Sequence, residues 1–144
     1  MTFLCLIGEC EFISALKGFW IVQAFVSTFF AILFLQSGLD KVFDRKGNLD
    51  WLTGHFSKTF LKGMVPMMVT TVTIVELIAG TCSLIGIGEA VIFRTYCFAF
   101  CGTVFAALAF IMLFFGQRIS KDYAGAWTIA SYFIIAVVDL YFLA

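Results

Sequence analysis

The chain has 144 residues, no net charge, 62% apolar residues and only 12% charged residues. Soluble domains contain about 45–50% apolar and about 25% charged residues, so this chain has too few polar groups to cover a surface that faces water. The composition excludes an ordinary soluble domain and a nucleic-acid-binding surface. It predicts one membrane domain, residues 1–144.

Four apolar stretches are long enough to cross the hydrocarbon core of a bilayer, which needs about 20 residues. They lie at about residues 19–39, 64–86, 95–116 and 123–144. Only helices and closed barrels satisfy the backbone in lipid, and these stretches are too long and too uniform for barrel strands. We therefore predict an all-α integral membrane protein, an antiparallel bundle of four transmembrane helices.

The connection between the first two spans is predicted to be an interfacial loop, residues 40–63. Its segment "DWLTGHFSKTF" mixes aromatic and basic residues, as segments at the membrane–water interface do. The alternative is a lid that places His55 and Lys58 over the end of the bundle.

Polar side chains gather at the two helix ends on the side of this loop. Gln36 and Asp40 are four residues apart and share a helical face, and the turn "GQRISKDYAGAW" at 116–127 repeats that spacing twice. Polar groups at a membrane edge are costly unless they are paired, so we predict an ion pair between Asp40 and Arg118 or Lys121. The alternative is that the basic side chains reach into the headgroups. The small residues at 124–126 should let the last span pack closely.

Glu76 lies about 12 residues into the second span, or ~18 Å along the helix axis, near the bilayer midplane. A charged carboxylate there costs at least about 2.5–3.5 kcal/mol. The nearest basic residues in the sequence, Lys62 and Arg94, lie toward the span ends, so the sequence favours a protonated Glu76. A structural hydrogen bond, a proton, substrate or quinone role, and a contact to another subunit all stay open. Asp139 is predicted to pair with Lys17 or Arg94.

The predicted polar cluster unites these groups with their neighbours: Gln36, Asp40, Lys41, His55, Lys58, Glu76, Gln117, Arg118, Lys121 and Asp122. The cysteines form no CxxC motif, and Cys97 and Cys101, four residues apart, are interpreted as packing residues. His55 is the one histidine of the chain, so the chain alone cannot bind haem through two histidines. No metal site is predicted.

Four stretches resemble the DoxX family of small bacterial and archaeal membrane proteins. They are "SGLDKVFD" at 37–44, "WLTGHFSKT" at 51–59, "VELIAG" at 75–80 and "GQRISKDYAGA" at 116–126. The resemblance implies a four-helix membrane fold in the bacterial inner membrane. It also implies an association with membrane redox assemblies such as a terminal quinol oxidase, and it transfers no catalytic residue.

Seven basic residues lie in the connections 40–63 and 117–122, namely Lys41, Arg45, Lys46, Lys58, Lys62, Arg118 and Lys121. The opposite side holds Lys17 and Arg94. This asymmetry predicts that both connections face the cytoplasm and that both termini face the periplasm.

We expect a non-catalytic accessory subunit of a larger respiratory or redox-linked membrane complex, because the chain carries no ligand set for a redox cofactor. Its partners would be lipid and other membrane subunits. The alternative is a quinone-interacting oxidoreductase component, with the quinone near the polar cluster. A small transporter or proton pathway through Glu76 ranks third, since no inverted repeat is visible.

Overall fold

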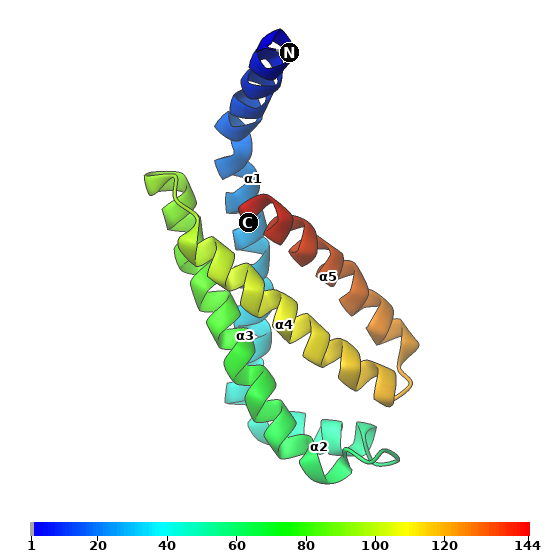
Figure 1. Cartoon of the computed structure of the whole chain (residues 1–144). Coiled ribbons are helices and arrows are strands. Elements are labelled where there is room, and N and C mark those ends of the chain that lie inside the picture. Colours follow the sequence, from blue (N-terminus) through cyan, green and yellow to red (C-terminus); the bar gives the residue numbers. More distant parts are fainter. Residues whose placement is uncertain (1) are drawn as a thin grey trace.

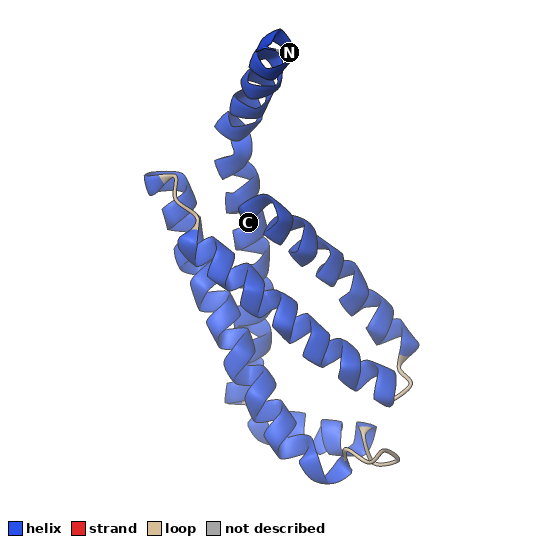
Figure 2. Ribbon diagram, in the orientation of Figure 1, coloured by secondary structure: helices blue, strands red, loops and turns tan. Residues whose placement is uncertain are grey.

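The computed structural model describes the backbone of residues 2–144 and the side chains of residues 18–144. Within this range the regular elements are all helical, which confirms the predicted all-α fold. In chain order they are α1 (Thr2–Phe43), α2 (Arg45–His55), η1 (Lys62–Met64), α3 (Val65–Gly88), η2 (Glu89–Phe93), α4 (Cys97–Ile119) and α5 (Tyr123–Leu143). Figure 2 shows these helices joined by short loops.

Four segments are long and apolar enough to cross a membrane: Gly18–Phe43, Lys62–Phe93, Cys97–Ile119 and Tyr123–Leu143. They match the four predicted spans. The first two are longer than predicted, because α1 continues through polar residues to Phe43 and the π-helical segment η2 extends α3 to Phe93. Large apolar side chains such as Phe25 and Trp127 are about three-quarters exposed, as expected for a surface that faces lipid.

Most of the connection 40–63 is helical rather than an irregular loop, and its interfacial position stays a prediction. The first helix continues to Phe43, and α2 follows after Asp44, whose carboxylate accepts a hydrogen bond from the backbone N–H of Gly47 at 3.2 Å. This N-cap satisfies one of the free donors at the start of α2. Phe56 then packs with the first turns of α3 in a small core formed by Phe56, Leu61, Val65 and Val69.

The transmembrane helices alternate in direction, as predicted for an antiparallel bundle (Figure 1). Helix α3 packs between α1 and α4, and α5 packs mainly on α4. The connections through α2 and between α4 and α5 lie at one end of the molecule, and the C-terminus lies toward the other. Three aromatic side chains from α1 and α4 form the centre of the core. They are Phe30, Phe34 and Phe110, and their ring centroids lie 5.0–6.1 Å apart.

The turn between α3 and α4 is held by two charged side chains. Arg94 has a left-handed backbone, φ 57°, and its guanidinium lies 3.7 Å from the ring centroid of Trp20 on α1. The Glu89 carboxylate accepts hydrogen bonds from the backbone N–H groups of Cys97 and Phe98 at 3.0 and 2.7 Å. A carboxylate at a helix N-terminus also interacts favourably with the helix dipole.

Candidate functional site

Glu76 is fully buried on α3 and forms an ion pair with Lys41 of α1. The Lys41 Nζ atom lies 2.8 Å from one carboxylate oxygen and 3.2 Å from the other. Ser37, one turn before Lys41, donates to Glu76 at 3.1 Å and accepts from Lys41 at 2.6 Å. A further contact of 3.2 Å joins Nζ to the Ser37 carbonyl. The three N–H groups of Lys41 are therefore used within this cluster.

The sequence argument that no cation reaches Glu76 is wrong, while the protonation state inferred from it stays a prediction. It placed Lys41 in a loop beyond the first span, whereas α1 continues past Lys41 and presents Ser37 and Lys41 on one face. The long lysine side chain then extends to the carboxylate on α3. The four-residue spacing of Ser37 and Lys41 was the available signal.

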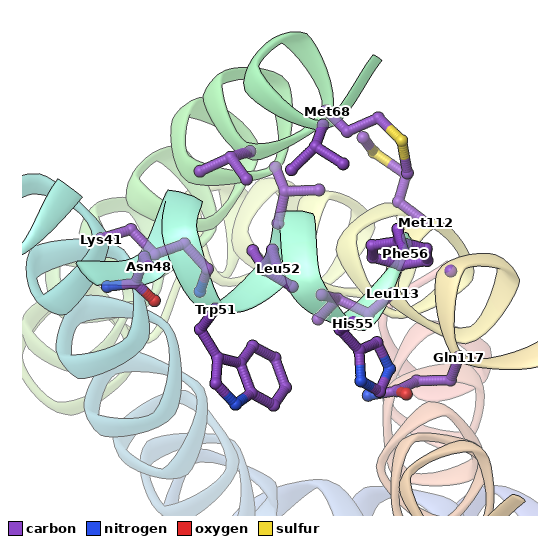
Figure 3. Close-up of a pocket in the computed structure, with 14 residues that line it drawn as sticks. Lys41, Asn48, Trp51, Leu52, His55, Phe56, Met68, Met112, Leu113 and Gln117 are labelled. Carbon is purple, nitrogen blue, oxygen red and sulfur yellow. The ribbon is translucent and has the colours of Figure 1, made fainter. Parts of the chain in front are cut away.

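A pocket of about 270 Å³ lies beside this ion pair, between α2 and the ends of α3 and α4. Most of its wall is apolar: Leu52, Phe56, Val65, Met68, Val69, Val72, Met112 and Leu113. Figure 3 shows Lys41 and Asn48 at one end of the pocket and His55 and Gln117 at the other. An apolar cavity with a few polar groups is the usual form of a small-molecule site.

The polar end of the pocket has a buried hydrogen-bond acceptor without a partner and a histidine beside it. The Gln117 side-chain oxygen is buried and makes no hydrogen bond within the described structure. His55 Nε2 lies 2.9 Å from Ser120 Oγ, and Ser120 gives its hydroxyl hydrogen to the Gln117 carbonyl at 3.1 Å. With the Ser120 hydrogen on the Gln117 backbone carbonyl, His55 Nε2 is the donor in this contact, and Nδ1 of a neutral ring is then an acceptor. Trp51 stacks on this ring at 5.0 Å.

The structure brings together only part of the predicted polar cluster. Lys41, His55 and Gln117 line the pocket, and Glu76 lies behind Lys41. Gln36 and Asp40 are exposed and line a separate, open hollow on α1. Lys41 therefore lies on a different face of α1 from Gln36 and Asp40. The four-residue spacing in the sequence did not distinguish these two faces.

The predicted ion pair between Asp40 and Arg118 or Lys121 is wrong, because Lys41–Glu76 is the one ion pair among the described side chains. The Arg118 guanidinium lies 4.9 Å from the ring centroid of Tyr123, and Lys121 is exposed with a left-handed backbone, φ 60°. Both basic residues therefore lie at the turn between α4 and α5 and form no ion pair with α1.

Asp122 has a structural role at the start of α5. Its carboxylate accepts a hydrogen bond from the Gly125 N–H at 3.0 Å. A Cβ atom at Gly125 would lie 2.8 Å from the Gln117 side chain, so the small residue there leaves room for the pocket glutamine. Lys58 is exposed and does not line the pocket, so it contributes no part of a lid.

A second buried polar cluster lies between α1, α4 and α5, and the sequence did not predict it. Asp139 contacts Thr103 Oγ1 at 2.6 Å and Gln23 Nε2 at 3.4 Å, and Gln23 also donates to Ser27 at 3.3 Å. The predicted pairing of Asp139 with Arg94 is wrong, and the side chain of Lys17 lies outside the described residues. Gln23 and Ser27 at a four-residue spacing inside an apolar span were the missed signal.

Two thiols meet across α3 and α4, with Cys82 Sγ 3.8 Å from Cys101 Sγ. Cys101 thus packs against another helix, while Cys97 is exposed. Among residues 18–144 no group of three or more histidine, cysteine, aspartate or glutamate side chains could hold a metal ion.

No family model, curated protein or solved structure matches this chain. The resemblance to the DoxX family rests on the four sequence stretches alone and stays a prediction. Function is therefore argued from the pocket and its residues.

Proposed function

We propose that this chain binds a quinone or quinol headgroup in the pocket between α2, α3 and α4. The observation that supports this proposal is the buried, unpartnered Gln117 oxygen at the end of an otherwise apolar pocket. An unpaired buried polar atom costs about 1–3 kcal/mol, and a ligand hydroxyl would remove that cost.

The chemistry of the wall suits this ligand class. A quinol combines an apolar ring with hydroxyl donors, and the pocket offers an apolar wall with acceptors on Gln117 and His55. The Gln117 amide N–H groups would donate to the oxygens of the oxidised form. Lys41 would not donate to the ligand, because its N–H groups are used by Ser37 and Glu76.

Two substitutions test the binding site. Gln117→Leu and His55→Ala should each weaken the binding of a short-chain quinol about tenfold, since one hydrogen bond to a buried group contributes about 1 kcal/mol or more. The measurement is the Kd of the analogue for the purified protein in detergent. Lys58→Ala is the matched control, because Lys58 belongs to the same connection and is exposed.

Equal Kd values for Gln117→Leu, His55→Ala and the parent would contradict the quinone site, provided that all three melt at the same temperature. A loss of binding in Lys58→Ala as well would show that the connection has unfolded rather than that one contact was lost.

An accessory-subunit role is the second candidate, and the exposure of α5 favours it. Only Ala126, Ala136 and Asp139 of this helix are buried within the described structure. The rest of the helix is available to lipid or to another membrane subunit. Mild detergent extraction from native membranes should then yield this chain with a partner at fixed stoichiometry. Elution as a chain with bound quinone and no partner would leave the first candidate alone.

We further propose that the protein lies in a bacterial inner membrane, with the α2 end of the bundle in the cytoplasm and both termini in the periplasm. The support is the DoxX resemblance and the excess of basic residues in the connections 40–63 and 117–122. In a cysteine-free background, Lys58→Cys should be protected from an impermeant thiol reagent in intact spheroplasts. Labelling before lysis would reverse the orientation.

A further inference from the structure

The buried cluster of Gln23, Ser27, Thr103 and Asp139 is separate from the pocket and is not used by the proposed function. It lies toward the opposite end of the bundle, where α1, α4 and α5 meet. All four side chains are at most 5% exposed. A carboxyl group in this setting must be neutralised, because a lone carboxylate is costly inside a membrane.

The contacts of Asp139 are to neutral groups. Gln23 approaches from α1, where it also donates to Ser27, and Thr103 approaches from α4. Asp139 has no ion-pair partner among the described side chains. Arg94, at the turn between α3 and α4, stacks its guanidinium on Trp20 and forms no ion pair with Asp139. No described side chain supplies the neutralising charge, and a bound proton would supply it.

The hydrogen-bond geometry of Thr103 favours a proton on Asp139. Thr103 Oγ1 lies 3.0 Å from the Ala99 carbonyl and 2.6 Å from Asp139 Oδ2, and both of these atoms are acceptors if the carboxyl is ionised. The single hydroxyl hydrogen can serve only one of them. With the Thr103 hydrogen on the carbonyl, the shorter contact needs a hydrogen on Asp139. A separation of 2.6 Å is typical of a strong O–H···O hydrogen bond.

We propose that Asp139 is a proton-binding site inside the membrane: its carboxyl carries an exchangeable proton and donates it to Thr103.

Gln23 provides a second position for the proton. Its side-chain oxygen is buried and unpartnered, while its nitrogen faces Asp139 at 3.4 Å. A rotation of the amide by half a turn would exchange the two atoms and present an acceptor to the carboxyl. The proton would then move from the Thr103 bond to the Gln23 bond, and its site would stay within the cluster.

Infrared spectroscopy of the full chain in liposomes tests the proposal. The parent at neutral pH should show the C=O stretch of a protonated carboxylic acid, which shifts in D₂O and disappears in Asp139→Asn. Thr103→Val should move the band to higher frequency, because the acid loses its acceptor, and Thr103→Ser should restore it. Glu76→Gln is the control and should leave the band unchanged, since Glu76 is paired with Lys41.

Absence of the band from the parent would overturn the proposal, as would its survival in Asp139→Asn. A band that disappears when sodium is added would assign the site to sodium and would also overturn it. If Asp139→Asn does not fold, the shift in Thr103→Val and its recovery in Thr103→Ser decide the question. None of these measurements depends on quinone binding, so the proposed quinone site and the proposed proton site can be contradicted independently.

Discussion

Lys41→Ala is expected to destabilise the folded chain by about 3–5 kcal/mol, the range observed when one partner of a buried ion pair is removed. The Glu76 carboxylate is fully buried and would lose its only cation among the described side chains. Ser37 would remain as a hydrogen-bond donor, but a hydroxyl does not compensate a full charge. The measurement is the free energy of unfolding in detergent, at a pH where the parent carboxylate is ionised.

The double variant Lys41→Met with Glu76→Gln distinguishes the ion pair from general packing. The double variant carries neither charge and keeps the approximate side-chain lengths. It should therefore recover most of the stability that Lys41→Ala loses, as replacements of whole buried ion pairs often do. The effects of Lys41→Met and Glu76→Gln as single substitutions should then sum to more than the effect of the double substitution. Strict additivity would show that Lys41 and Glu76 do not interact in the membrane.

Gly86→Val is expected to separate α3 from α4 and to cost at least about 1–3 kcal/mol, the usual range for overpacking a core. A Cβ atom at Gly86 would lie 2.8 Å from the backbone nitrogen and 2.9 Å from the Cα atom of Ala99. These are backbone atoms, so no side-chain rotation relieves the contact. Close approach through small residues is the usual means of helix association in membranes.

Gly88→Val is the matched control for this effect. It lies in the same helix two residues later, and a Cβ atom there meets nothing within 4 Å. The measurement is the melting temperature of the two variants in one detergent. Both variants change the backbone entropy of the unfolded chain, so a difference between their melting temperatures reports the lost packing of Gly86→Val. Equal melting temperatures would contradict the close contact between α3 and α4.

The turn at 117–122 shows how far the sequence could predict the candidate site. Its polar residues were expected to meet the end of α1 as a group, yet Gln117 points into the pocket, Arg118 lies over Tyr123, and Asp122 caps α5. A four-residue spacing identifies a shared face on one helix. It carries no information on which neighbouring helix that face meets, or at what height.

The sequence by itself determined the solvent and the architecture of this protein. Four apolar stretches can satisfy their backbones in lipid only as helices, so the number of spans and their alternation follow from length and composition. Which polar groups meet was decided only by the tertiary structure. Lys41 reaches Glu76, and Gln23 and Thr103 reach Asp139, because specific helices pack at specific heights, and these contacts span 35, 116 and 36 residues of the chain. Local spacing does not encode separations of that length, whereas the packing of side chains between helices does.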